Sequence, residues 1–230
     1  MRPRVGVVVF PGSNDDRDAA WSLTALGAEV KMVWYADAEL PAVDAVVLPG
    51  GFSYGDYLRA GAIARFAPAM RAVADFAVGG GLVLGICNGF QVLCEAGLLP
   101  GALRPNTSLS FVCRDLRVRV ERADTPFTAR CEQGQLLTIP VKHGDGCWFA
   151  TPELLSEVEE NDQIVLRYAE GGNPNGSVAD VAGVVNADGN VMGLMPHPEH
   201  AVDPLLGSGD GALVLASFID AARDRTLAHA

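Results

Sequence analysis

Apolar runs alternate with segments of helical periodicity through the first half of the chain. Residues 5–10 form a continuous apolar run typical of a buried parallel strand, and further strands are expected at residues 28–34, 43–48 and 82–86. Helices are expected between them at residues 15–26 and 62–78, the second with a possible interruption at Pro68. This alternation predicts an α/β fold, with a doubly wound, mostly parallel sheet and helices on both faces. A site is then expected at the carboxyl ends of the strands.

The pattern changes in the second half of the chain. Residues 111–141 alternate polar with apolar positions, which predicts additional antiparallel strands joined to the parallel core. Near the C-terminus one helical face is apolar and should pack on the sheet: Ala212, Leu215, Ala216, Ile219 and Ala222. The residues after Ala222 are expected to fray. Because no repeat, low-complexity tract or linker interrupts the pattern, we expect one domain over residues 1–230.

Composition and charge narrow the class of protein. The chain has 230 residues, 49% of them hydrophobic, and a formal net charge of -11. The Lys and Arg residues form no cluster along the sequence. Because neutralising phosphates requires clustered cations, a nucleic-acid partner is not expected. No apolar run is long enough to span a bilayer, so no membrane partner is expected either. Five cysteines without a C-x-x-C pair fit reduced thiols, and therefore a cytoplasmic location.

The most informative local feature is a cysteine between two glycines at the end of an apolar strand. Cys87 follows the strand at residues 82–86, and Gly85 and Gly89 flank it with the spacing of a G-x-S-x-G nucleophile elbow, sulfur replacing oxygen. A short helix over residues 88–97 would direct its positive N-terminus at the sulfur and favour the thiolate. Taken alone, Cys87 also fits a small buried cysteine in a tight turn.

A cysteine nucleophile requires a proton carrier, and His197 is the best candidate among four histidines. It lies between two prolines after a strand-like run that begins at Val191. Pro198 should keep His197 extended, so that Glu199, two positions on, shares its face and orients the imidazole as the third member of a triad. By itself, the His-Pro-Glu segment also fits an ordinary turn with a solvated carboxylate.

Acyl transfer also requires donors for the developing oxyanion. A Pro-Gly-Gly segment follows the strand at residues 43–48, and its Gly51 amide, together with the Asn88 amide directly after the nucleophile, makes a plausible pair. In isolation the same segment is a common turn at the end of a strand.

Together these motifs resemble the class I glutamine amidotransferase family. The sequence Gly-Ile-Cys-Asn-Gly-Phe-Gln at residues 85–91 carries that family's C-x-G-x-Q signature, Pro-Gly-Gly-Phe its oxyanion segment and Met-Pro-His-Pro-Glu its histidine and glutamate. Five longer segments are similar to one branch of the family, the small glutaminase subunits of phosphoribosylformylglycinamidine synthase: residues 10–14, 49–64, 106–114, 173–177 and 195–199.

The resemblance implies a mechanism and partners. Cys87 would form a γ-glutamyl thioester with glutamine, with His197 and Glu199 completing the triad and the Gly51 and Asn88 amides holding the oxyanion. Four further residues are implied to hold glutamine: Gln91, Ser108, Ser110 and Phe111. No metal or other cofactor is expected in this chain, which also lacks a P-loop. A synthetase subunit using ATP and Mg would receive the ammonia and amidate formylglycinamide ribonucleotide, together with a small third subunit.

The chain departs from the family pattern at three places. Asp15 stands where the family often has cysteine, and His200 where arginine is usual, while the stretch from His143 to Trp148 differs from the more usual His-Gly-Glu-Gly-Arg-Tyr. These departures concern local partner contacts and leave the expected chemistry intact. We interpret the acidic group that begins at Asp15 as helix N-terminal charge, and His143 with its neighbours as part of a contact loop, in preference to metal sites.

Two other functions remain open at this level. One is a stand-alone cysteine hydrolase or peptidase with the same elbow, which would need no synthetase. The other is a non-catalytic regulatory subunit that retains the elbow as scaffold, although intact Cys87, His197 and Glu199 weigh against it.

Overall fold

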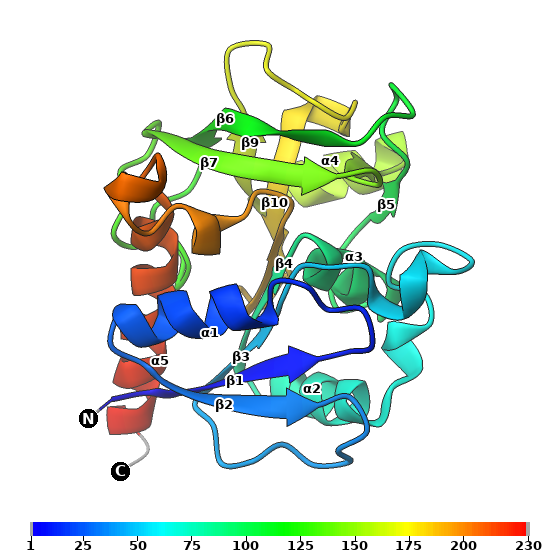
Figure 1. Cartoon of the computed structure of the whole chain (residues 1–230). Coiled ribbons are helices and arrows are strands. Elements are labelled where there is room, and N and C mark those ends of the chain that lie inside the picture. The colour runs from blue at the N-terminus through cyan, green and yellow to red at the C-terminus, as the bar shows by residue number, and fades with distance from the viewer. Residues whose placement is uncertain (1, 229–230) are drawn as a thin grey trace.

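The computed structural model describes residues 2–228 and contains one large mixed β-sheet. Figure 1 shows this sheet running through the molecule, with the first strands at one end and β6 and β7 at the other. In spatial order its nine strands are β2 (Glu29–Trp34), β1 (Arg4–Val9), β3 (Ala45–Leu48), β4 (Leu82–Ile86), β11 (Val191–Leu194), β10 (Val181–Val185), β9 (Ile164–Tyr168), β6 (Val112–Val120) and β7 (Leu136–His143). A separate two-stranded sheet pairs β5 (Ala102–Arg104) with β8 (Cys147–Phe149).

The sheet has a parallel and an antiparallel half that meet at β11. The pairings from β2 through β1, β3 and β4 to β11 are parallel, and those from β11 through β10, β9 and β6 to β7 are antiparallel. The predicted α/β fold with added antiparallel strands is confirmed. The polar–apolar alternation of β6 corresponds to one buried and one exposed face in its second half, whereas β3 is buried at every position.

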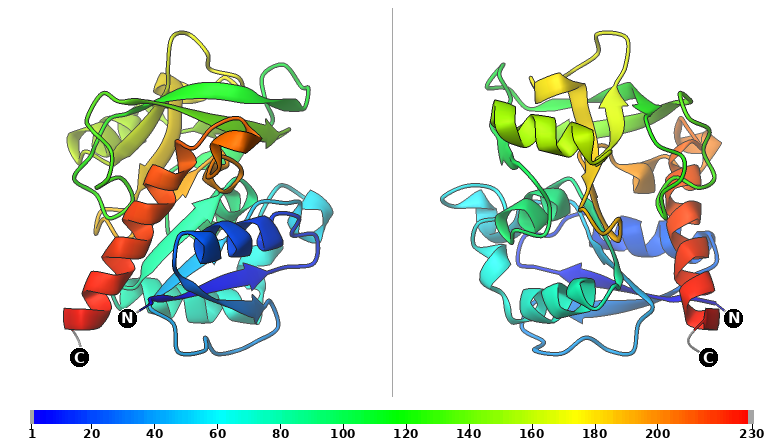
Figure 2. Two further views of the ribbon diagram at one scale, coloured as in Figure 1. Left: turned by 60° about the vertical axis from the view of Figure 1, so that its left-hand side comes forward. Right: turned by 180° about the vertical axis from the view of Figure 1, so that it is seen from behind.

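Helices cover both faces of the parallel half, as predicted. In the two views of Figure 2, α1 (Asp16–Ala25) and α5 (Gly211–Ala228) lie on one side of these strands, and α2 (Pro68–Val78) and α3 (Asn88–Glu95) lie on the other. The remaining helix, α4 (Pro152–Glu160), precedes β9. No helix within residues 2–228 is both long enough and apolar enough to cross a bilayer.

Two expectations about helices can be compared with the structure, and one of them differs. The segment expected as a helix over residues 62–78 is interrupted before Pro68: a 3-10 turn covers Ala64–Phe66, Ala67 is extended, and α2 begins at Pro68, because the first helical position needs no N–H donor and favours the fixed φ of proline. At the other end, α5 continues to Ala228 instead of fraying after Ala222. Its apolar face is buried, and Phe218 stacks on Phe127 with ring centroids 5.9 Å apart. The expected fraying of residues 229 and 230 lies outside the described residues.

The register of the parallel strands brings three strand ends to one edge of the sheet. Leu48 at the end of β3 pairs with Gly85, and Leu194 at the end of β11 pairs with Ile86. The segments that follow β3, β4 and β11 therefore emerge side by side. These segments carry the expected oxyanion glycine, the cysteine, and the histidine with its glutamate.

Candidate active site

Cys87 occupies a strained turn between β4 and α3. Its backbone has φ 50° and ψ -104°, which a non-glycine residue rarely adopts and which is typical of functional positions. The flanking glycines are needed for space, because a Cβ at Gly85 would lie 2.7 Å from the carbonyl carbon of Gly89 and a Cβ at Gly89 would run into the Leu48 carbonyl. The Cys87 side chain is 5% exposed, and its Sγ lies 3.7 Å from the Lys142 carbonyl oxygen. The structure thus forms the predicted elbow.

His197 and Glu199 form a close, buried pair in the segment after β11. Nδ1 of His197 lies 2.6 Å from Oε1 of Glu199, and His197 is 1% exposed. The sequence predicted this pairing from extended geometry, but residues Pro198–His200 form a single 3-10 turn. That turn, and not strand alternation, brings the carboxylate back to the ring. The backbone amide of His197 donates to the Pro140 carbonyl, which fixes the segment against β7.

The electrostatics of this pair favour a protonated imidazole. Burial lowers the pKa of His197, but the Glu199 carboxylate and the Cys87 sulfur oppose it, and the net effect is a raised pKa. The other ring nitrogen, Nε2, is buried and has no hydrogen-bond partner within residues 2–228. Cys87 is thus near enough to influence the ring while Nε2 remains free to exchange a proton.

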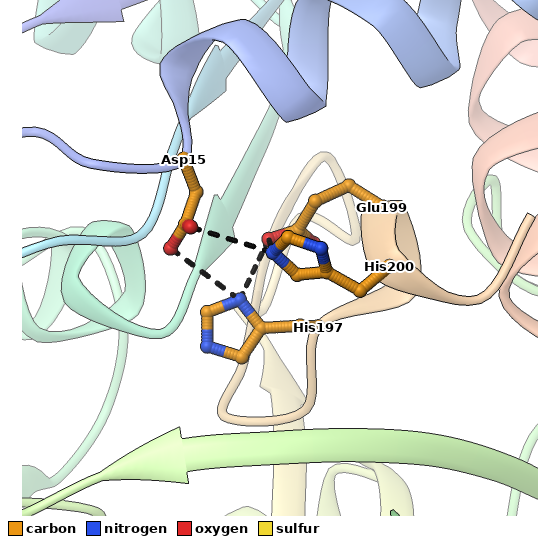
Figure 3. A group of neighbouring side chains, drawn as sticks. All are labelled: Asp15, His197, Glu199 and His200. Carbon is orange, nitrogen blue, oxygen red and sulfur yellow. Dashed lines mark hydrogen bonds and ion pairs between the residues drawn. The ribbon is translucent and has the colours of Figure 1, made fainter. Parts of the chain in front are cut away.

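A second carboxylate, from the opposite end of the sequence, also reaches this imidazole. Asp15 precedes α1 and is 3% exposed. Figure 3 shows its carboxylate directed at the rings of His197 and His200, while the Glu199 carboxylate contacts His197; these three residues come from the segment after β11. Asp15 Oδ2 lies 3.7 Å from Nδ1 of His197, and Oδ1 lies 3.3 Å from Nε2 of His200. The ammonium of Lys142 also contacts Oδ1 of Asp15.

This arrangement corrects the interpretation of Asp15 as a helix N-terminal charge. Asp15 stands at the N-cap of α1, but its side chain makes no capping hydrogen bond and turns into the site instead. Burial raises the pKa of Asp15, yet hydrogen bonds to His200 and Lys142 and the charge of His197 outweigh burial, so that the net pKa is lowered. Only the unusual residue types at positions 15 and 200 hinted at this contact in the sequence.

The same four side chains form the cluster in which a metal ion could be considered. One ligand atom from each of Asp15, His197, Glu199 and His200 lies within 4.8 Å of the others. However, Lys142 places a cation on Asp15, and Nδ1 of His197 is already engaged by Glu199. Both features oppose a second cation, so we interpret the cluster as an ion-pair network.

The second group considered as a metal site lies around His143, and its side chains are engaged in hydrogen bonds within the protein. The His143 ring lies 3.1 Å from Oδ1 of Asn106 and 3.4 Å from Nδ2 of Asn175, while the Cys147 thiol donates to the Gly176 carbonyl. Burial, together with the charge of His197, lowers the pKa of His143 to about 4, so this ring is neutral at pH 7. These contacts brace the loop after β7 against the turn at residues 173–177.

The two proposed oxyanion donors both lie beside the cysteine. Gly51 lines the same small pocket as Cys87, and Asn88 is the first residue of α3. In the turns, loops and helix caps of residues 2–228, neither of these two amide N–H groups donates a hydrogen bond to a backbone carbonyl. Gly51 has φ 146° and fits closely against the preceding turn, since a Cβ there would lie 2.6 Å from both Gly12 O and Asn14 N. A side chain at this position would displace the amide.

The pocket beside Cys87 contains only part of the predicted glutamine-binding set. Its walls come from the loop after β3, the elbow with α3, and the end of β7: Gly51, Phe52, Asp56, Cys87, Gln91, Lys142, His143, Gly144 and Asp145. The Gln91 side chain is buried and held in place, since Nε2 donates to the Asp145 carbonyl at 2.6 Å and Oε1 accepts from Asn88 at 2.8 Å. Gln91 is therefore where the sequence predicted it.

The remaining three predicted residues lie at or beyond the pocket rim. Phe111 is exposed and pairs with Phe52, with ring centroids 6.3 Å apart. Ser108 and Ser110 are exposed and hydrogen-bond to one another, and neither lines the pocket. Asn106 donates to the Ser110 carbonyl, which ties this loop to the site only indirectly.

Two carboxylates in the pocket were missed by the sequence analysis. Asp56 and Asp145 both line it, and neither forms an ion pair with a Lys or Arg within residues 2–228. Burial, with a smaller contribution from Asp145, raises the pKa of Asp56 to about 6. Asp56 also has a positive φ of 54°, so a strained backbone holds this side chain in the pocket with Cys87.

Comparison with known proteins agrees with this fold and identifies the family. Residues 2–209 match the CobB/CobQ-like glutamine amidotransferase domain. The sequence is 62% identical over 220 residues to the phosphoribosylformylglycinamidine synthase subunit PurQ of Rubrobacter xylanophilus, a match covering 96% of this chain and 99% of that protein. It is 56% identical over 228 residues to the subunit of the same name from Salinibacter ruber, with coverage of 96% and 97%.

A solved structure with a similar sequence has the same fold. One chain in the structure of PurLQS from Thermotoga maritima superposes with a TM-score of 0.88 at 46% sequence identity, covering 96% of this chain and 99% of that one. The fold and the cysteine elbow are those of a glutamine amidotransferase. The chain belongs to the class I glutamine amidotransferase family, within the group of phosphoribosylformylglycinamidine synthase PurQ subunits.

Proposed function

We propose that residues 1–230 form one glutaminase domain, the subunit of phosphoribosylformylglycinamidine synthase that hydrolyses glutamine and delivers ammonia to a synthetase. The observation that carries this proposal is the Cys87 elbow facing the buried His197–Glu199 pair, in a chain that aligns over nearly its whole length with PurQ subunits. Shared fold alone would not support the activity, because similar folds host different chemistries.

The first half of the reaction uses the strained cysteine as nucleophile. The Cys87 thiolate attacks the side-chain carboxamide carbon of glutamine, and the amides of Gly51 and Asn88 stabilise the oxyanion that develops. As the tetrahedral intermediate collapses, the C–N bond breaks, and the His197 imidazolium gives its proton to the departing nitrogen. The products are ammonia and a γ-glutamyl thioester on Cys87.

The second half releases glutamate. The neutral His197 ring now accepts a proton from water, whose oxygen attacks the thioester carbonyl and expels the Cys87 thiolate. Glu199 holds Nδ1 throughout and stabilises the imidazolium formed in each cycle. The chain's own residues supply every group in this cycle, so the proposal includes no metal or other cofactor in this subunit.

Substrate recognition follows from the charges of glutamine. The substrate carries an α-ammonium group, and the pocket offers two carboxylates without a cationic partner, Asp56 and Asp145. We assign the α-ammonium to this pair, while Gln91 shapes the pocket floor. Phe111 belongs to the rim, where it pairs with the wall residue Phe52, and Ser108 and Ser110 lie on the same loop outside the pocket.

Replacing Asp56 by asparagine should raise the KM for glutamine about tenfold or more, because a charge-assisted contact to the ammonium is lost. In the unchanged protein, kcat/KM should fall as the pH drops through about 6, because the raised pKa of Asp56 means that its charge is lost at that pH. Steady-state kinetics across pH 5 to 8 would measure both effects. Asp188→Asn, an exposed aspartate in the turn between β10 and β11, is the matched control. An unchanged KM for Asp56→Asn would remove Asp56 from the binding site.

The partners follow from the same proposal. The ammonia goes to a synthetase subunit that binds ATP and Mg and amidates formylglycinamide ribonucleotide, and a small third subunit completes the complex. The similarity of this chain to one chain of PurLQS from Thermotoga maritima supports an assembly of this kind. A cytoplasmic location belongs to the proposal as well, because all five cysteines are unpaired, as expected in a reducing compartment.

The proposal is tested by mixing the purified chain with the synthetase and third subunit. Glutamate formation should be slow for the chain alone and much faster in the complex with ATP and formylglycinamide ribonucleotide, with glutamate and amidated product formed in equal amounts. Full-rate glutamine hydrolysis by the isolated chain would instead indicate a stand-alone hydrolase. Complex formation without glutamate production would indicate a non-catalytic subunit.

A further inference from the structure

We propose that Asp15 is a second positioning carboxylate for His197, acting with His200 and Lys142 to hold the imidazole toward Cys87. This inference rests on the proposed glutaminase function, because it assigns Asp15 a role in the same proton transfers. The catalytic group would then have four members, because Asp15 joins Cys87, His197 and Glu199. Both carboxylates face Nδ1 of His197.

The geometry supports a specific contact. Nδ1 of His197 lies 2.6 Å from Glu199 and 3.7 Å from Oδ2 of Asp15, so Glu199 accepts the hydrogen bond and Asp15 adds a charge on the same side of the ring. Asp15 is 3% exposed, which leaves its charge weakly screened by water. Its other oxygen is held 3.3 Å from Nε2 of His200 and also contacts the Lys142 ammonium.

The backbone around Asp15 is shaped for this approach. The amides of Asn14 and Asp15 both lie 3.2 Å from the Gly50 carbonyl, which anchors the start of α1 beside the segment after β3. A Cβ at Gly50 would lie 2.7 Å from Cε1 of His197 and would run into the Asp15 carboxylate. Glycine at this position therefore leaves the space in which carboxylate and ring meet.

Lys142 connects the network to the nucleophile. Its ammonium binds Asp15, and its backbone carbonyl lies 3.7 Å from Sγ of Cys87. The charge of Lys142 offsets part of the charge of Asp15, so that two carboxylates can be buried beside one imidazole. The network includes two of the residues at which the chain departs from the usual family pattern, Asp15 and His200.

The role of Asp15 is to stabilise the imidazolium. The groups that face His197 are Glu199, Asp15 and Cys87, with His143 and His200 nearby. Glu199 and Cys87 raise the pKa of His197, while the contact with Asp15 shows in the lowered pKa of Asp15, to which the charge of His197 contributes. Removing the Asp15 charge lowers the pKa of His197. The alkaline limb of the rate profile, where the imidazolium is lost, must then move to lower pH.

Asp15→Asn tests this role, because asparagine keeps the shape and one acceptor oxygen but removes the charge. In the complex, we expect kcat for glutamine hydrolysis to fall about tenfold, with KM changed less than twofold, and the alkaline limb to move down by about one pH unit. Asp18 is an exposed aspartate in the first turn of α1, three positions after Asp15, so Asp18→Asn removes the same charge nearby and should change none of these values.

A double-mutant cycle separates positioning from a general structural role. His200→Gln keeps an N–H donor for Asp15 and should retain near-normal kcat, whereas His200→Ala should lose about threefold. Combined with Asp15→Asn, His200→Ala should cause little further loss, because its partner charge is already absent. Additive losses in the double variant would contradict a shared network.

A second readout does not depend on glutamine hydrolysis. The pH dependence of Cys87 alkylation by iodoacetamide, measured on the folded chain, reports the thiolate–imidazolium pair directly. Its alkaline inflection should also move down by about one pH unit in Asp15→Asn. If the unchanged protein proves inactive on glutamine but this shift is found, the glutaminase function fails and the role of Asp15 stands. An unshifted inflection and an unchanged kcat in a folded Asp15→Asn variant overturn the inference.

Discussion

Replacing Cys87 by alanine should abolish glutamine-dependent amidation, with a loss of about 1,000-fold or more in kcat. Cys87 supplies the only thiol among the residues that line the pocket, and the ammonium of Lys142, another wall residue, is engaged by Asp15. The backbone turn at residue 87 is set by the flanking glycines and by the amide of residue 87, which donates to the Leu194 carbonyl, so the variant should still fold. The measurement is glutamate formation by the assembled complex.

Two controls separate loss of chemistry from loss of assembly. The Cys87→Ala complex should still amidate formylglycinamide ribonucleotide when ammonium salts replace glutamine, because the synthetase reaction does not use this sulfur. Cys94→Ala is the matched cysteine variant. Cys94 lies on α3, where burial raises the pKa of its thiol, and its Sγ donates to the Pro100 carbonyl. This variant should retain full activity. Substantial glutamine turnover by Cys87→Ala would contradict the covalent mechanism.

Replacing His197 by asparagine should lower kcat for glutamine hydrolysis by about 100- to 10,000-fold, the range expected for loss of a general acid and base. The same imidazole protonates ammonia and activates water, so both halves of the reaction suffer. Glutamine binding should be nearly unchanged, because Asp56 and Asp145, to which we assign the ammonium, and Gln91 line the pocket, whereas His197 does not. Single-turnover kinetics with quenched samples would show whether the thioester still forms slowly and then accumulates.

His229, the penultimate residue of the sequence, provides a matched control for loss of one imidazole. His229→Asn should leave kcat and KM unchanged. Should His197→Asn retain more than a tenth of the original rate, another group must serve as the proton carrier, and Asp15 and Lys142 would be the first residues to replace.

The parallel half of the fold could be predicted because its signals are local. Continuous apolar runs specify strands buried on both faces, and glycine-bounded ends specify where they stop. The boundaries of β4 agree with the prediction, and those of β1 and β2 differ from it by one residue. The strands β9 and β10 were not assigned, and neither was α4. Both strands are short apolar runs, and only pairing within the sheet distinguishes such runs from helical or loop segments.

The site residues also fall into two groups, those with a local signal in the sequence and those without one. Gln91 could be identified because it belongs to a signature within about one turn of Cys87 on a short helix. The two pocket carboxylates could not be identified, because Asp56 follows β3 and Asp145 follows β7, and nothing local to either segment indicates that they meet. Ser108 and Ser110 show the opposite case, in which a segment that resembles the family lies on an exposed loop outside the pocket.

The sequence by itself determined the α/β fold class, and it predicted the Cys87 elbow and the His-Pro-Glu segment, because each depends on residues within one strand, one turn or one helix start. The tertiary structure decided which charges surround the imidazole. Asp15 and His200 are 185 positions apart, and the sheet brings them together by setting the end of β11 near the beginning of α1. Contacts of that kind arise from packing across the sheet and leave no periodic signal along the chain.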